Sequence, residues 1–188
     1  MNILEQLAEY SRVRVEADKK KINLDQIKKM AFLVKEEALE DFAFEKALKK
    51  QELAFICECK KASPSKGVID HKFQYLDIAK EYEMAGVDCI SVLTEPKWFL
   101  GSDEYLREIA HTVKIPCLRK DFTVDTENSR KLRDLIPYDI LFVSESGVKD
   151  VADIRKIREM GADAVLIGET MMRAHDKSAK LKELRGVL

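Results

Sequence analysis

The feature that most constrains the fold is an alternation of short apolar runs with helical patterns along the chain after residue 52. Five runs are rich in Val, Ile, Leu and Cys, a composition typical of strands buried on both faces. They are LAFICEC (53–59), CISVL (89–93), IPCLRK (115–120), ILFVSES (140–146) and AVLIGE (164–169). Helical patterns lie between them, near residues 72–85, 103–111, 126–135 and 150–160. This alternation of strand and helix predicts a parallel sheet of the α/β class.

The N-terminal part of the chain follows a different pattern. Its apolar side chains recur at helical spacing, and Asn2 with Glu5 resembles a capping box at the start of a first helix. No linker or change of composition separates this part from the strands. We therefore expect a single domain over residues 1–188, with a helical N-terminal extension at 1–50 and five βα units at 53–188.

Charge and hydropathy exclude several classes of partner. The 33 Lys and Arg nearly balance the 34 Asp and Glu, so no overall field favours nucleic acid. No run approaches the roughly 20 apolar residues of a membrane span, and the charged start does not resemble a signal peptide. We expect a cytoplasmic protein that binds neither nucleic acid nor membrane, and a small acidic substrate would need a local basic site.

The cysteines include a C-x-C pair, Cys57 and Cys59, which raises the question of a metal or redox site. The two residues occupy alternate positions of an apolar run, on the face opposite Glu58 and Lys60. Core packing is therefore the favoured interpretation. The three histidines show no ligand spacing with each other or with the cysteines, so no metal site is expected.

Charged residues stand where the predicted strands end, which is where parallel α/β folds place their chemistry. Glu58 and Lys60 are two residues apart and share one face of their strand. An unpaired charge on a doubly buried strand is costly, so the two form either a structural ion pair or a functional site, and we favour the site. Lys120 ends the third strand, where the alternative is a surface charge on a loop.

Two glycines, Gly147 and Gly168, stand at the ends of the fourth and fifth predicted strands, in SESGVKD and IGETMM. Each comes shortly before a predicted helix, where free N–H groups and the helix dipole favour an anion. Either glycine alone would be an ordinary turn residue. As consecutive βα loops, they match the phosphate site usual after the last two strands of a barrel.

Five motifs then identify a family resemblance. They occur in the order ECKKASPSKGVI, AGVDCISVLTEPKWFLGS, CLRKDF, LFVSESGV and GADAVLIGETMM, after the helical extension. Together they resemble the indole-3-glycerol phosphate synthase family over nearly all of the chain, and the first and third are highly specific. The resemblance implies a TIM-barrel-like fold and a lyase of tryptophan biosynthesis. Such a lyase closes the indole ring of 1-(2-carboxyphenylamino)-1-deoxyribulose 5-phosphate with loss of carbon dioxide and water, without a cofactor.

The resemblance also implies roles for individual residues. Lys120 corresponds to the general acid that protonates the ribulose carbonyl. Glu58 and Lys60 correspond to a pair that assists proton transfer and holds the substrate, with Lys60 also reaching its phosphate. The remaining correspondences are Glu145 and Ser146 as catalytic residues; Ser63, Pro64, Phe99 and Phe122 as substrate-binding residues; and Ser146, Gly147, Gly168 and Glu169 with Lys60 as phosphate-binding residues.

The chain is about sixty residues shorter than the roughly 250 of an eight-unit barrel. KDFTVD resembles the end of the family's third strand, whereas FTVDTENSRKLRDLIP resembles the segment leading from the sixth strand into the seventh. One stretch, residues 122–125, thus serves for both, and the fourth to sixth βα units are missing. The resemblance implies that a glutamate of the fifth strand, the family's general acid–base group, and an asparagine and an arginine of the sixth have no counterpart.

Two functions of different class remain open. The first is a lyase of impaired activity, whose missing groups another subunit could supply. The second is a non-catalytic remnant of the barrel, either phosphate-binding or purely structural. A missing acid–base group typically costs about 10²–10⁴-fold in rate.

The short junction also constrains the strand order. If ten of residues 123–138 form a helix, too few remain to travel around the outside of a half barrel. We therefore expect the strand at 140–144 to lie beside the strand at 115–120, or to be donated to another chain. A closed barrel of five strands would be only about 9–10 Å wide. We expect an open or partner-completed sheet, truncated relative to a TIM barrel, and a homo-oligomer that covers it.

Overall fold

The computed structural model describes residues 2–37, 42–50, 52–120, 137, 139–145 and 147–186, apart from the side chains of 34–37, 119 and 120. Two compact units are present, Met1–Ala43 and Phe44–Leu188. The helix predicted near 126–135 lies outside the described residues, as do Phe122 and Ser146.

The first unit contains the helices α1 (Ile3–Lys21) and α2 (Leu24–Glu37). The predicted capping box at the start of α1 is confirmed. The Asn2 side chain accepts a hydrogen bond from the Glu5 amide at 2.9 Å, and the Glu5 carboxylate accepts one from the Asn2 amide at 2.8 Å. Asn23 and Gln26 make the same reciprocal pair at the start of α2. Both helices therefore begin where a side chain satisfies backbone N–H groups that the helix itself leaves free.

The second unit is built on a parallel sheet of five strands, which confirms the predicted α/β class. The strands are β1 (Ala54–Cys59), β4 (Cys89–Leu93), β5 (Cys117–Lys120), β6 (Val143–Glu145) and β7 (Ala164–Ile167). Their order in the sheet is β5-β4-β1-β7-β6. β1 lies in the middle, where Ile56 is paired with Cys89 on one side and with Leu166 on the other. A small antiparallel hairpin, β2 (Ala62–Ser63) with β3 (Gly67–Val68), follows β1.

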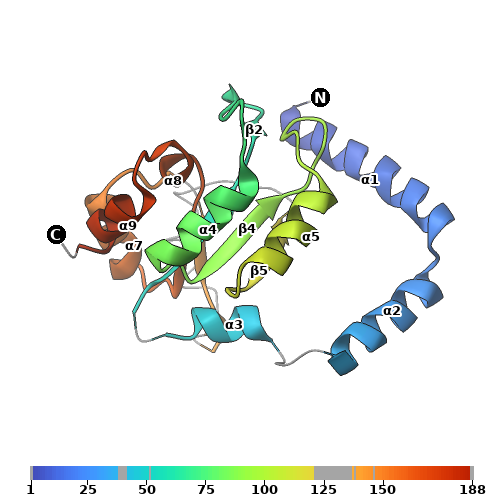
Figure 1. Cartoon of the computed structure of the whole chain (residues 1–188), viewed down its shortest axis with the longest axis horizontal. Helices are drawn as coiled ribbons and strands as arrows, with labels where there is room; N and C mark the ends of the chain where they lie inside the picture. Colours follow the sequence, from blue (N-terminus) through green and yellow to red (C-terminus); the bar gives the residue numbers. More distant parts are fainter. Residues whose placement is uncertain are drawn as a thin grey trace. The chain divides into compact units, whose positions relative to one another are not determined.

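Helices cover one face of this sheet and bury the larger apolar cluster. They are α4 (Tyr75–Ala85), α5 (Asp103–Thr112), α7 (Val151–Glu159), α8 (Glu169–Arg173) and α9 (Lys177–Arg185). Figure 1 shows α4 and α5 side by side over β4, and α9 also packs against α4. Cys57 and Cys59 are fully buried in this cluster. Burial raises the pKa of both thiols far above that of an exposed cysteine, which agrees with core packing rather than a reactive site.

The other face of the sheet carries a smaller apolar cluster near the amino ends of the strands. Leu48, from the short helix α3 (Ala43–Leu48), packs there with Ile56 and Leu166. This cluster leaves the carboxyl ends of the same strands to polar residues. Side chains alternate along β1, and its even-numbered residues point to this face. The side chains that follow the apolar cluster toward the carboxyl end are therefore those of even-numbered residues.

The predicted position of β6 beside β5 is wrong. β5 pairs with β4 at one edge of the described sheet, and β6 pairs with β7 at the other. The 18 residues 121–138 have a contour length of about 60 Å, so chain length alone does not confine β6 to a place beside β5. The other consecutive strands remain neighbours, β1 with β4, β4 with β5 and β6 with β7, and β7 joins the sheet next to β1. The expected open sheet is confirmed for the strands that the structure describes.

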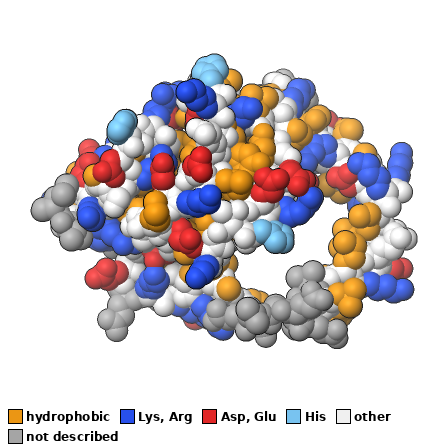
Figure 2. All heavy atoms as spheres, viewed as in Figure 1, with side chains coloured by type: hydrophobic (Ala, Val, Ile, Leu, Met, Phe, Trp, Pro, Cys, Tyr) orange, Lys and Arg blue, Asp and Glu red, His pale blue; other side chains and the backbone are white. Residues whose placement is uncertain are grey.

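The surface shows mixed charge. On the face seen in Figure 2, acidic and basic side chains are interspersed, which agrees with the net charge of −1. No helix in the described part of the chain is long and apolar enough to cross a membrane.

Candidate functional site at the carboxyl edge of the sheet

The carboxyl end of β1 presents an acid and a base on the face away from the helices. Cys57 and Cys59 point into the helix-covered cluster, so Glu58 and Lys60 point to the opposite face. Lys60 Nζ lies 2.7 Å from Glu58 Oε2, and the exposed fractions of the two side chains are 11% and 1%. Lys60 is therefore the member of this ion pair that solvent can reach.

Gly168, directly after β7, completes this corner of the site. A Cβ atom at residue 168 would lie 2.5 Å from Glu58 Oε2 and 2.9 Å from Lys60 Nζ. A side chain there would have to displace the ion pair. The absence of a side chain at this position is thus what lets the carboxyl ends of β1 and β7 converge.

The loop after β4 is held by a residue that the sequence interpretation missed. The buried carboxylate of Glu95 accepts hydrogen bonds from the amides of Lys97, Trp98 and Phe99, at 2.9, 2.7 and 3.1 Å. Phe99 is buried, and its carbonyl accepts a hydrogen bond from the Ala62 amide in the loop after β1. Glu95 is a positioning residue for the predicted Phe99. Because every non-proline residue carries a backbone amide, no pattern in the sequence marks this role, and only the folded loop reveals it.

Gly101 is needed in the same loop for a different reason. A Cβ there would lie 2.2 Å from the Leu93 carbonyl oxygen, and the Gly101 amide donates to the Glu95 carbonyl. Backbone approaches backbone too closely for any side chain.

The loops after β6 and β7 are tied together. The Thr170 hydroxyl, in α8, donates to the Val148 carbonyl, and Gly147 has φ +81°, a value that favours glycine. The N-terminus of α7 is already occupied, because the Asp150 carboxylate accepts from the amides of Ala152 and Asp153. An anion at this loop would be held by loop amides rather than by α7.

The remaining predicted residues are distributed unevenly. Glu145 ends β6 beside Leu166 of β7 and is half-buried. Lys120 ends β5 beside Leu93, and its side chain lies outside the described part. Glu169 pairs with Arg173 at 2.9 Å across the surface of α8, so only its backbone could contact an anion.

In the β2–β3 hairpin, Ser63 is buried and Pro64 is exposed. The described geometry thus unites Glu58, Lys60 and Gly168 in one corner. It places Phe99 in the adjoining loop.

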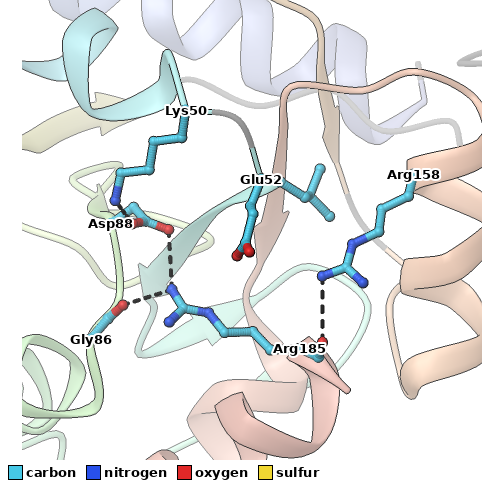
Figure 3. Close-up of a pocket in the computed structure, with 7 residues that line it drawn as sticks. Lys50, Glu52, Gly86, Asp88, Arg158 and Arg185 are labelled. Carbon is cyan, nitrogen blue, oxygen red and sulfur yellow. Dashed lines mark hydrogen bonds and ion pairs between the residues drawn. The ribbon is translucent and has the colours of Figure 1, made fainter. Parts of the chain in front are cut away.

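A cavity of about 200 Å³ lies at the opposite, amino end of the sheet (Figure 3). There, Lys50 and Arg185 both pair with the Asp88 carboxylate, which also accepts a hydrogen bond from the Phe55 amide at 2.8 Å. Arg158 donates to the Arg185 carbonyl. The cluster joins segments that are far apart in the sequence. This end of a barrel sheet usually contributes to stability rather than to chemistry. Among the described residues, no group of three or more His, Cys, Asp and Glu is placed to hold a metal.

Fold and site together define an α/β protein with a pair of buried charges at the carboxyl edge of an open parallel sheet. Residues 4–128, and separately residues 122–184, match the sequence model of the family described as indole-3-glycerol phosphate synthase. The chain belongs to this family.

Curated relatives with similar sequences carry the name of the same family. The chain is 39% identical to indole-3-glycerol phosphate synthase of Ruminiclostridium cellulolyticum over 259 residues, covering 98% of this chain and 99% of the relative. It is 34% identical to that of Endomicrobium trichonymphae over 258 residues, covering 97% and 99%. It is 30% identical to that of Lachnoclostridium phytofermentans over 270 residues, covering 99% and 100%.

These alignments bear on the missing segment. The first runs over 259 positions, against 188 residues in this chain, so at least the difference, 71 positions, faces no residue here. The two family matches share residues 122–128. That overlap contains the stretch 122–125, which the sequence interpretation assigned to two places in the family at once.

Proposed function

We propose that this chain is an indole-3-glycerol phosphate synthase-like lyase of reduced activity, acting on 1-(2-carboxyphenylamino)-1-deoxyribulose 5-phosphate. The observation that carries the proposal is the corner formed by Glu58, Lys60 and Gly168 in a chain of this family. A buried acid–base pair that is open to solvent only at the lysine suits proton transfer and capture of an anionic substrate.

The residues take the following roles in this proposal. Lys120 protonates the ribulose carbonyl as the aromatic carbon attacks it. Glu58 and Lys60 assist proton transfer and hold the substrate, and Phe99 forms part of the apolar wall beside them. Glu145 and Ser146 act from the end of β6. The loops at Gly147, Gly168 and Glu169 provide amides for the phosphate, and no cofactor takes part.

The proposed rate is low because the family's acid–base glutamate has no counterpart. Loss of such a group costs about 10²–10⁴-fold, so we expect activity at least about 10²-fold below that of a complete family member. The test is the fluorescence of the indole product, with purified protein and the carboxyphenylamino substrate. Activity should disappear in Lys120→Ala, and activity that persists in this variant removes Lys120 from the mechanism.

A second candidate, a non-catalytic phosphate-binding remnant, is favoured by the 71 or more family positions that the chain lacks. The two candidates differ in one measurement. Both predict weak binding of phosphate at low salt in isothermal titration, but only the first predicts a fluorescent product. Absence of any phosphate binding contradicts both and leaves a purely structural remnant.

The open sheet motivates a further part of the proposal, a homo-oligomer. β5 and β6 each pair with one strand only in the described sheet, and such edges are normally covered. Light scattering at tens of micromolar should give a mass above that of the 21.6 kDa chain. A strictly monomeric protein with cooperative unfolding overturns this part.

A further inference from the structure

Ser91 is a buried hydroxyl in the middle of β4, on the face that carries the candidate site. Its neighbours Ile90 and Val92 point into the helix-covered cluster, whereas Cys89 belongs to the cluster on the other face. Ser91 therefore points the same way as Glu58. The two residues are paired in the register of β1 and β4, which places them on adjacent strands about 4.8 Å apart.

Two buried oxygens at this corner, Ser91 Oγ and Glu58 Oε1, make no hydrogen bond within the described residues. Ser91 is 0% exposed, and within the described residues its Oγ makes no hydrogen bond. By contrast, the buried carboxylates of Asp88 and Glu95 each accept hydrogen bonds from backbone amides. A buried hydroxyl without a partner lowers stability. Other buried polar groups near β4 are satisfied, so the missing hydrogen bond is specific to this corner.

Packing alone does not require a serine here. The equivalent small positions on the same face are filled by Ala54, Cys89 and Ala164, all fully buried and apolar. An alanine at residue 91 would fill the same layer without an unsatisfied oxygen. The hydroxyl therefore adds no hydrogen bond to the structure described. This indicates that it gains a hydrogen-bond acceptor when a ligand binds.

The ion pair beside Ser91 shows how that partner arises. Lys60 is the solvent-accessible member, so an entering anion attracts its ammonium group first. As Lys60 turns toward the anion, the carboxylate of Glu58 stays behind in a nearly fully buried position. Each donor that a buried carboxylate gains stabilises its charged form.

We propose that Ser91 is a positioning residue of this site: when an anionic ligand draws Lys60 away, the Ser91 hydroxyl donates a hydrogen bond to the Glu58 carboxylate and holds it in place. The hydroxyl can reach a new acceptor by rotation about a single side-chain bond. No covalent change is involved. The inference rests on the proposed function, because it requires that an anion binds at Lys60.

The test uses inorganic phosphate as the probe and three variants of the full chain. In Ser91→Ala, the ligand-free protein should unfold at the same denaturant concentration as the parent or at a higher one, because an unsatisfied hydroxyl is removed. Its phosphate affinity should fall about tenfold, because a hydrogen bond to a charged group is lost in the bound state. Ser91→Thr retains the hydroxyl and should bind phosphate within about threefold of the parent.

Ser144→Ala is the matched control. Ser144 is also a buried strand serine, but it is paired with Val165, on the helix-covered face. Its replacement should leave phosphate affinity unchanged. A fall in affinity equal to that of Ser91→Ala would overturn the proposal.

The other outcomes are equally decisive. If Ser91→Ala destabilises the ligand-free protein and leaves phosphate affinity unchanged, the hydroxyl has a structural partner and the proposal is wrong, although the anion site stands. If the parent itself does not bind phosphate, the anion site of the proposed function is wrong, and the role of Ser91 fails with it.

Discussion

The two ends of the central strand β1 each hold a buried carboxylate beside a cation, but they differ in how completely its surroundings are satisfied. Near the amino end, Asp88 accepts from the Phe55 amide and pairs with both Lys50 and Arg185. At the carboxyl end, Glu58 pairs with Lys60, and the hydroxyl beside them on β4 has no partner among the described residues. The saturated cluster joins distant parts of the chain. At the carboxyl end, unused hydrogen-bonding capacity remains, and this is the basis for proposing a ligand there, whereas charge alone does not distinguish the two ends.

The largest effect is expected from Lys60→Met, which removes the lysine of the ion pair from beside the buried Glu58 carboxylate. Breaking a buried pair from one side costs about 3 kcal/mol or more of unfolding free energy. Denaturant unfolding followed by circular dichroism measures this loss.

The matched control is Arg107→Met. Arg107 and Glu104 form an ion pair at 2.8 Å in which both side chains are more than half exposed. Its removal should change the free energy of unfolding by no more than about 0.5 kcal/mol. Equal effects of the two substitutions would mean that the Glu58–Lys60 pair is solvated in solution.

At the amino end, Asp88→Ala should lower the unfolding free energy by about 2 kcal/mol, because the Phe55 amide loses its acceptor inside the protein. Phosphate affinity should not change, since the cluster lies at the other end of the strands. Asp88→Asn retains an acceptor for the amide and should recover part of the loss. If phosphate binding weakens in Asp88→Ala, the two ends of the strands are energetically coupled and do not act independently.

The smallest effects are expected from two glycine substitutions, one at each end. Gly168→Ala forces the ion pair to move and should cost about 1 kcal/mol of stability. Gly86→Ala meets only an Arg185 nitrogen at 3.8 Å but places alanine at φ +86°, which also costs about 1 kcal/mol. Phosphate titration separates them, because only Gly168→Ala should weaken binding. Two variants with the same affinity would place the anion away from Gly168.

Local patterns in the sequence predict the elements well because their causes are local. The capping box at Asn2 and Glu5 depends on residues three apart, and the alternation in LAFICEC determines that Cys57 faces the helices and Glu58 does not. The family resemblance identified by CLRKDF and its companion motifs is confirmed by the matched relatives. These features need no knowledge of what lies across the sheet.

Long-range features could not be predicted in the same way. The positions of β5 and β6 at opposite edges depend on which strand pairs next to β1, and no local signal records this pairing. Ser91 reads as an ordinary residue in CISVL until the register places it opposite Glu58. Glu95 becomes recognisable only when its carboxylate is seen to collect three amides.

The position of β1 between β4 and β7 has a consequence for synthesis. One neighbour of β1 follows soon after it, but the other begins at Ala164, which pairs with Ala54 across 110 residues of sequence. At about 5–20 residues per second, the ribosome needs roughly 5–20 s to make that interval. Throughout it, the central strand of the nascent sheet presents an unpaired edge to other chains. The yield of soluble protein should therefore depend on translation speed and chaperone supply between these two strands.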